Sequence, residues 1–181
     1  VVRFKMSILQ KICRSFDQNA SLEMKISFDN FCIQNSYWLD DFSMYWVLKQ
    51  ENKQKAWIDW SSKIIQNTEL LNEVKVMQFL FHYQWNELRN YGLKKGINII
   101  GDMPIYVGYD SADVYANRGL FQLNNAGKMM YQGGCPPCNY QDQGQLWGSP
   151  LYSWENHEET SFEWWQQRFR KIFEMVDIVR L

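Results

Sequence analysis

The chain has 181 residues and a formal net charge of −1, with 19 basic and 20 acidic side chains. This balance excludes the basic surface of a nucleic-acid-binding domain, and the longest apolar runs are far too short to cross a membrane. The length is sufficient for one domain with a hydrophobic core. The chain begins with Val1 and shows no signal peptide, so we expect the natural protein to start further upstream.

Apolar residues recur at helical spacing in the N-terminal part, which predicts three helices over residues 4–16, 22–33 and 37–49. Asp40 and Asp41 fall in the first turn of the third helix. They either compensate the helix dipole or form an acidic pair near a sugar site. A polar turn region is expected over residues 53–66, where Trp57 and Trp60 lie on one side if the segment is helical.

A longer helix is predicted from Thr68, a good N-cap residue, to about Lys95. Lys94 and Lys95 suit the negative end of this helix, and Gly96 suits a left-handed cap. His82 on this helix is expected to be a packed or surface side chain.

Two short apolar runs, residues 97–103 and 176–181, predict buried strands with Asp102 and Arg180 near their carboxyl ends. The run from Thr160 to Glu163 resembles a capping box that opens a helix between them. Strand, helix and strand in this order form a βαβ unit, which predicts an α/β fold with a parallel sheet. In a (β/α)8 barrel both side chains would lie on the catalytic face, but two strands cannot close a barrel, so the chain is expected to be part of something larger.

The stretch from Pro104 to His157 contains all four prolines and no periodic pattern. Its many aromatic residues argue against disorder, so we predict an ordered binding loop. Aromatic rings beside amides and carboxylates suit a carbohydrate, since sugar hydroxyls both donate and accept hydrogen bonds. Most of these rings are expected in the core; Trp147, between Gly144 and Gly148, is expected to face a groove on a flexible segment.

Glycosidic chemistry normally needs two carboxylates, and the candidates on this loop face are Asp102, Asp110 and Asp113. Spacing alone does not select a pair among them. Cys135 and Cys138 form a single CxxC, which lacks the further ligands of a zinc site and the helix of a redox motif. We therefore expect both thiols to stay reduced in a loop.

Several long motifs together resemble the 4-α-glucanotransferases (amylomaltase or disproportionating enzyme) of glycoside hydrolase family 77. They are Gly101-Asp102-Met103-Pro104-Ile105-Tyr106-Val107, Tyr109 to Asn117, Gly144-Gln145-Leu146-Trp147-Gly148-Ser149-Pro150-Leu151-Tyr152-Ser153-Trp154 and Asp177-Ile178-Val179-Arg180. The resemblance covers residues from about Phe28 to Leu181.

The resemblance implies part of a (β/α)8 TIM barrel of the α-amylase clan, with N-terminal helices and a long loop insertion after the third strand. Residues 1–95 would precede that strand, and 96–181 would form the βαβ part with the inserted region 104–159. It also implies retaining transfer of α-1,4-glucan segments between maltooligosaccharides, with no cofactor or metal. The nucleophile is expected just after Leu181, so the 181-residue segment alone is expected to be inactive.

The residues that match the family's substrate-binding positions are Asp102, Tyr140, Gln145, Trp147 and Arg180. Asp102 would end the third strand, Arg180 would orient the nucleophile, and the other three would belong to the loop that arches over the glucan. That loop departs from the family pattern Val-Pro-Pro-Asp-Tyr-Phe-Ser, because here it is Cys135-Pro136-Pro137-Cys138-Asn139-Tyr140-Gln141. The departure concerns glucan affinity and the balance of transfer over hydrolysis.

Two alternatives stay open from the sequence. One is a non-catalytic glucan-binding or interaction protein derived from the same fold. The other is an unrelated helical scaffold, which would need the 104–157 stretch to be mobile. The expected location is the cytoplasm, or a plastid if a transit peptide precedes the chain; no nucleic-acid or membrane partner is expected, and the sequence does not indicate an oligomeric state.

Overall fold

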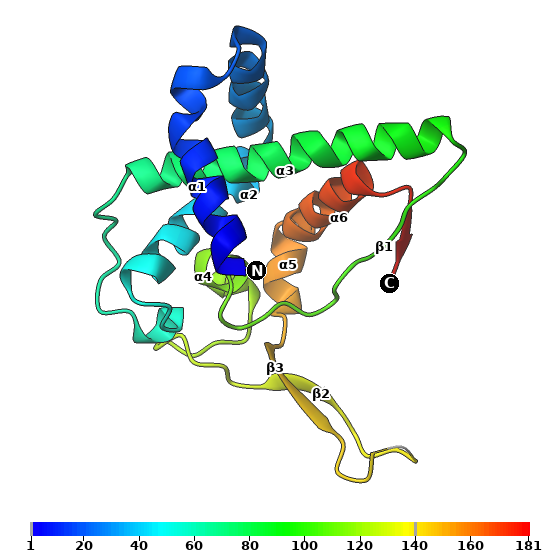
Figure 1. Ribbon diagram of the computed structural model, residues 1–181. Coiled ribbons are helices and arrows are strands. Elements are labelled where there is room, and N and C mark those ends of the chain that lie inside the picture. Colours follow the sequence, from blue (N-terminus) through cyan, green and yellow to red (C-terminus); the bar gives the residue numbers. More distant parts are fainter. Residues whose placement is uncertain (1, 140) are drawn as a thin grey trace. The chain divides into compact units, whose positions relative to one another are not determined.

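The computed structural model describes residues 2–139 and 141–181 of the chain. It divides into two compact units: unit 1 is Val1–Lys55 with Trp60–Asn90, and unit 2 is Ala56–Asp59 with Tyr91–Leu181. Unit 1 is helical, whereas unit 2 combines helices with short strands (Figure 1).

Unit 1 contains α1 (Val2–Asn19), α2 (Leu22–Glu51) and most of α3 (Glu69–Lys94). The first predicted helix is confirmed, but the expected break after residue 33 is wrong because α2 is continuous. Polar side chains at that point bond within the helix: Asn35 Nδ2 donates to the Phe31 carbonyl, and Ser36 Oγ donates to the Ile33 carbonyl. Such local bonds satisfy the polar groups without ending the helix.

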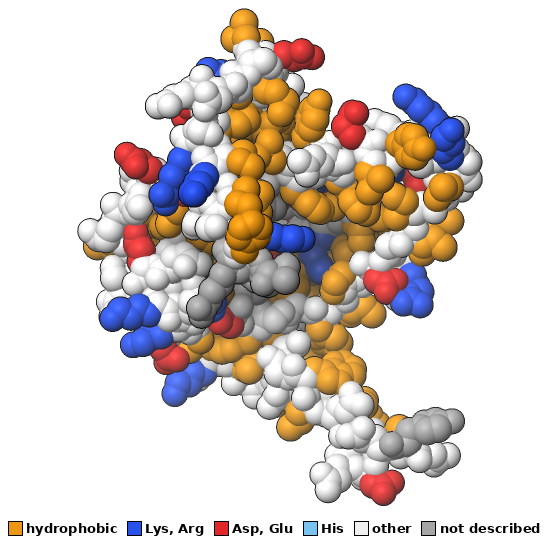
Figure 2. Space-filling model, in the orientation of Figure 1, with side chains coloured by type: hydrophobic (Ala, Val, Ile, Leu, Met, Phe, Trp, Pro, Cys, Tyr) orange, Lys and Arg blue, Asp and Glu red, His pale blue; other side chains and the backbone are white. Residues whose placement is uncertain are grey.

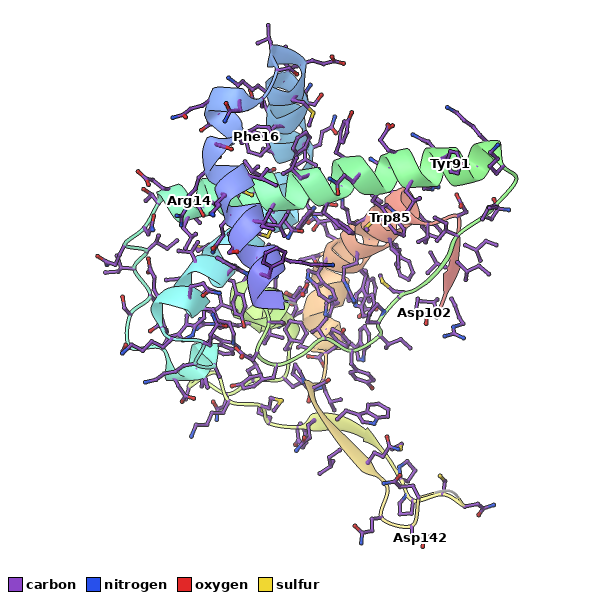
Figure 3. The ribbon with its side chains drawn as sticks, in the orientation of Figure 1. Arg14, Phe16, Trp85, Tyr91, Asp102 and Asp142 are labelled. Atoms are coloured by element: carbon purple, nitrogen blue, oxygen red, sulfur yellow. The ribbon has the colours of Figure 1, made fainter. Side chains whose placement is uncertain are left out.

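The core of unit 1 is a cluster of phenylalanine rings from all three helices. Phe16, labelled on α1 in Figure 3, meets Phe28 with ring centroids 5.3 Å apart and Phe79 at 6.0 Å. Phe28 and Phe79 are 5.5 Å apart. These three pairs are edge-to-face, the geometry that the aromatic quadrupole favours.

Asp40 lies in the middle of α2 instead of in a first turn, so the helix-dipole interpretation is wrong. Its carboxylate forms an ion pair with Lys75 of α3, with Oδ1 2.5 Å from Nζ. Burial, together with the nearby Asp40 charge, raises the pKa of Asp41 above its ordinary value. Asp40 therefore contributes to the contact of α2 with α3, and Asp41 is a partly buried neighbour on α2.

The ends of α3 agree with the predicted positions. The helix begins at Glu69, directly after the predicted N-cap residue Thr68, but the side chain that accepts from its first turn is that of Asn67, whose Oδ1 receives the Leu70 N–H. At the other end Gly96 has φ of +73°, and the N–H groups of Gly96 and Ile97 donate to the carbonyls of Leu93 and Gly92. This is a Schellman motif, in which glycine accommodates the left-handed residue.

The segment of Trp57 and Trp60 is helical only over the 3-10 turn η1 (Trp57–Asp59), so the condition under which both indoles were expected on one side is not met. Trp57 belongs to unit 2 and contacts the ring of Tyr109 at 5.3 Å. Trp60 belongs to unit 1 and contacts the ring of Tyr45 at 5.4 Å. Both indoles are buried.

In unit 2, β1 (Ile100–Asp102) pairs with β4 (Ile178–Arg180) in parallel, as predicted. The expectation that both strands are buried is wrong, since Ile100 is 66% and Ile178 50% exposed. Alternate residues of a strand point to opposite faces. In this two-stranded sheet only the face that carries Gly101 and Val179 is partly covered.

The stretch from 104 to 157 contains more regular structure than predicted. It includes α4 (Ala112–Ala116), the 3-10 turn η2 (Arg118–Leu120), and the beginning of α5 (Trp154–Glu159). It also includes an antiparallel hairpin of β2 (Gln132–Cys135) and β3 (Gln145–Pro150), which projects from the rest of unit 2 (Figure 1). The hairpin has no apolar alternation because glycines, prolines and polar residues fill it.

The helix before β4 is α6 (Glu163–Met175), but the predicted capping box is wrong. The residue before the helix is Phe162, in the left-handed region with φ of 59° and without a side-chain cap. The Thr160 hydroxyl instead donates to the His157 carbonyl, which closes α5. The residues of the predicted capping box therefore lie between two helices, after the end of α5 and before the start of α6.

Within the described residues the strands form two two-stranded sheets and no closed barrel. None of the helices in that part is long and apolar enough to cross a membrane.

Candidate active site

Asp102 and Arg180 lie side by side at the carboxyl ends of β1 and β4. They are register partners in the parallel pair. The guanidinium of Arg180 donates from Nε to Asp102 Oδ1 at 2.8 Å and from Nη2 to Oδ2 at 2.7 Å. This two-point geometry is the strong form of an arginine–carboxylate pair. The sequence predicted both side chains at the carboxyl ends of neighbouring strands, and the structure confirms this and adds the direct bond between them.

The pair is exposed to solvent and electrostatically coupled. The side chains are 61% exposed for Asp102 and 74% for Arg180. The hydrogen bonds from Arg180 lower the pKa of Asp102, and the same contact raises the pKa of Arg180. The site therefore presents an ionised carboxylate and a guanidinium with donors to spare for a ligand.

Three hydrogen bonds fix the position of the segment that follows β1. The Met103 N–H donates to the Arg180 carbonyl at 3.0 Å. Arg168 Nη2 of α6 donates to the Pro104 carbonyl at 2.7 Å, and the Tyr152 hydroxyl donates to the Ile105 carbonyl at 2.5 Å. These bonds hold the backbone between Asp102 and the next aromatic residue, Tyr106.

Tyr106 supports Trp147 of β3, with ring centroids 5.5 Å apart. The indole is 47% exposed, and its Nε1 donates to Gln145 Oε1 at 2.9 Å. Gly133 of β2 leaves room for the tyrosine ring, because a Cβ there would lie 3.1 Å from Tyr106 Cε1. Sequence reasoning missed Tyr106 as a support, although it follows a strand end by only a few residues.

Trp147 thus stands on a paired strand and not on the flexible segment that the flanking glycines suggested. Asp102 and Tyr106 are four residues apart, so their Cα atoms are at most about 14 Å apart. In Figure 2 hydrophobic side chains gather where the hairpin joins the rest of unit 2. A ring surface and a charged pair therefore lie within reach of one extended ligand.

The remaining residues predicted for the loop site are distributed differently. Gln145 is exposed at the start of β3, where it orients Trp147. Tyr140 lies outside the described residues. Asp142 marks the far end of the hairpin in Figure 3, well apart from Asp102.

Asp110 and Asp113 have structural contacts of their own. Asp110 Oδ1 accepts the Trp57 N–H at 3.1 Å, which attaches η1 to the loop. Asp113 lies in the first turn of α4, where burial raises its pKa and Arg168 opposes that shift. The catalytic carboxylate pair that the chemistry needs is not assembled from these residues.

The cysteines are free thiols, with Cys135 at the end of β2 and Cys138 exposed beyond it. Over residues 2–139 and 141–181 there is no group of three or more His, Cys, Asp or Glu side chains that could hold a metal ion.

Comparison with protein families matches the whole chain, residues 1–181, to glycoside hydrolase family 77, described as 4-alpha-glucanotransferase. The 4-alpha-glucanotransferase of Aquifex aeolicus is 35% identical over 193 aligned residues, which cover 100% of this chain and 38% of that protein. The enzyme of Clostridium butyricum is 36% identical, covering 98% of this chain and 38% of its own length. The potato protein (Solanum tuberosum), named as chloroplastic/amyloplastic, is 38% identical over 88% of this chain and 30% of its own.

Among solved structures, amylomaltase from Streptococcus agalactiae in complex with acarbose superposes with a TM-score of 0.88 at 32% identity. The match covers 98% of this chain and 38% of that one. Amylomaltase from Corynebacterium glutamicum shares the fold, with a TM-score of 0.77 at 22% identity over 97% of this chain and 24% of that one. The chain spans about 38% of the length of the first two curated relatives.

Proposed function

This chain belongs to glycoside hydrolase family 77, and we propose that the protein transfers α-1,4-glucan segments between maltooligosaccharides with retention of configuration. The observation that carries the proposal is the Asp102–Arg180 pair at the ends of adjacent parallel strands. In barrel enzymes the carboxyl ends of the strands form the catalytic face. The names of the relatives supply the reaction, and the exposed Trp147 nearby fits a sugar substrate.

In this proposal Asp102 and Arg180 bind sugar hydroxyls and set the local charge. The free lone pairs of the carboxylate accept hydrogen bonds, while the guanidinium donates them. Trp147 offers a flat apolar face to a glucosyl ring, and Gln145 holds the indole in place. Retaining transfer also needs a nucleophile and an acid/base carboxylate about 5–5.5 Å apart, which are separate from Asp102 in this scheme.

We also propose that residues 96–181 contribute the third and fourth strands of a (β/α)8 barrel, with 104–159 inserted between them and residues 1–95 preceding the third strand. The similarity to the amylomaltase structures supports this arrangement. Tyr140 belongs to the proposed substrate loop through the family resemblance alone. We propose that the protein acts in the cytoplasm or in a plastid. The name of the potato relative, chloroplastic/amyloplastic, supports the second location.

The test is disproportionation of maltotriose by the full-length protein. We expect glucose together with maltooligosaccharides longer than the substrate, with the α-anomer retained in NMR spectra. Asp102→Asn should lower kcat/KM at least about tenfold, because it removes the charge-assisted bonds. Trp147→Ala should mainly raise KM, and Asp29→Asn, on an exposed position of α2, is the matched control.

Glucose without longer products would identify a hydrolase and reject transfer. Glucan binding without turnover would favour the non-catalytic glucan-binding alternative. The same assay on the 181-residue chain tests the expectation that this segment is inactive by itself.

A further inference from the structure

A second concave surface of unit 2 has no residue in common with the site described above. It is a cavity of about 550 Å³, within the range of about 300–1,000 Å³ that small-ligand sites occupy. One wall comes from the segment of Arg118 and Gln122, and the other from residues 153–156, with Trp154 among them.

The walls of this cavity are joined by hydrogen bonds. The Gln122 N–H donates to the Leu151 carbonyl at 2.8 Å, and the Ser153 N–H donates to the Leu120 carbonyl at 2.9 Å. Asn156 Nδ2 donates a third hydrogen bond between the same two walls, to the Gly119 carbonyl. The pocket is therefore formed before any ligand binds, which lowers the entropy cost of binding.

Trp154 is a partly exposed ring that packs against two other aromatic rings. Its indole is 55% exposed, yet it contacts Tyr152 with centroids 5.1 Å apart and stacks on Trp165 at 6.1 Å with 20° between the planes. An indole fixed in this way presents an apolar surface to the cavity without first having to be ordered.

The polar groups of the cavity suit a neutral ligand that both donates and accepts hydrogen bonds. Gln122 Nε2 donates to the Tyr152 carbonyl at 3.1 Å, which leaves its Oε1 as an acceptor. Arg118 Cζ lies 4.7 Å from the centroid of the Trp57 ring, and its Nε donates to the Tyr115 carbonyl at 3.2 Å, which leaves the two Nη groups as donors. Among the described residues, none forms a hydrogen bond or ion pair with the Glu155 carboxylate.

The formal charges of Arg118 and Glu155 cancel, and they are the only charged residues in the lining of this cavity as described. A phosphate would meet Glu155, and a cation would meet Arg118, so each would face one unfavourable charge. A polyhydroxylated neutral ligand uses the acceptors, the donors and the ring together. This combination favours a sugar.

We propose that this cavity, the Trp154 pocket, binds a distal stretch of the same α-glucan chain that is handled near Asp102. The identity of the ligand rests on the function proposed above. The two places are close together, because ring contacts run from Trp147 to Tyr106, from Tyr106 to the buried Tyr152 at 6.2 Å, and from Tyr152 to Trp154 at 5.1 Å. One extended oligosaccharide can therefore reach from one exposed indole to the other. A chain held at the pocket raises the effective concentration of its other glucosyl units at the first site.

The experiment compares kcat/KM for a long linear maltodextrin with kcat/KM for maltotriose in the full-length protein. Trp154→Ala and Glu155→Ala should each lower the ratio of the two values, by about tenfold for Trp154→Ala, because only long chains reach the pocket. Glu158→Ala, at another exposed position of α5, should leave the ratio unchanged. Glu155→Ala is included because its side chain has no partner among the described residues, so its removal is not expected to disturb the fold.

An equal fall for both substrates would show a general structural effect, and no change in the ratio would show an unused pocket; each result overturns the proposal. If the wild-type protein fails to convert maltotriose at all, the proposed function fails instead. In that case electrophoresis in gels that contain long maltodextrin still tests whether the pocket binds glucan. We expect the wild type to be retarded more than the Trp154→Ala variant, and equal retardation of the two proteins would overturn the proposed pocket.

Discussion

Arg180 and Asp102 are 78 residues apart in the sequence, yet they are register partners whose side chains form a two-point ion pair at the end of two parallel strands. The contact sets the charge of the proposed glucan site. It also makes the site dependent on correct pairing of β1 with β4.

Replacing Arg180 with Gln should raise the pKa of Asp102 toward its ordinary value, because the hydrogen bonds from Arg180 are the main cause of the lowered pKa. Carbon-detected NMR titration of the Asp102 carboxyl in the full-length protein measures the change. Arg170→Gln, an exposed position of α6, is the control. An unchanged Asp102 pKa in Arg180→Gln would show that the ion pair is absent in solution.

The same pair predicts the sign of one pH effect. Since the folded-state pKa of Asp102 lies below its unfolded value of about 3.9, the contribution of the pair to stability is complete above that pH. It is lost as the pH falls through the folded-state pKa. The effect is small because both groups are solvent-exposed, and acid unfolding curves of wild type and Arg180→Gln should converge at the lowest pH.

Cys13 should react very slowly with alkylating reagents in the folded protein. Burial, aided by the charge of Glu73, raises the pKa of its thiol to about 11, so roughly one molecule in a thousand carries the thiolate at pH 8. Cys138 is exposed and is expected to be modified first. Mass spectrometry of timed iodoacetamide reactions would contradict this if Cys13 were alkylated as fast as Cys138.

The raised pKa of Cys13 also has a consequence for stability. Its contribution is fully present below the unfolded-state pKa and decreases as the pH rises through about 11. Alkaline unfolding curves of wild type and Cys13→Ala should therefore differ most near neutral pH and approach each other above pH 11.

Gly134→Ala should destabilise the β2–β3 hairpin, because the added Cβ would lie 2.2 Å from the carbonyl oxygen of Gln145. The expected cost is roughly 1–3 kcal/mol. Gly108→Ala is the matched control, since nothing lies within 4 Å of its Cβ position. Amide hydrogen exchange over residues 132–150 reports the hairpin, and equal protection in both variants would refute this role of Gly134.

Phe79→Ala and Phe81→Ala compare a buried ring and an exposed ring on the same helix, α3. Phe79 is 3% exposed within the phenylalanine cluster, so its removal should cost about 3–5 kcal/mol. Phe81 is 53% exposed, and its removal should cost less than about 1 kcal/mol. Urea unfolding measures both, and equal costs would show that the cluster does not stabilise unit 1.

Local sequence patterns predicted the elements whose stabilising contacts are local. The end of α3 at Gly96 and the parallel alignment of the two strands agree with the structure. The capping box at Thr160 and the break within α2 were wrong, because backbone turns and bonds inside the helix satisfied the polar groups in another way. Propensity signals are weak where such alternatives compete.

The sequence by itself determined the helical N-terminal part, the strand ends that carry Asp102 and Arg180, and the motifs of the family. Periodicity and short motifs encode these features within a few neighbouring residues. Only the tertiary structure decided that Arg180 pairs with Asp102, that Tyr106 supports Trp147, and that Trp154 borders a cavity of its own. These contacts join residues that are tens of positions apart, and their geometry arises only when strand pairing and ring packing bring distant segments together.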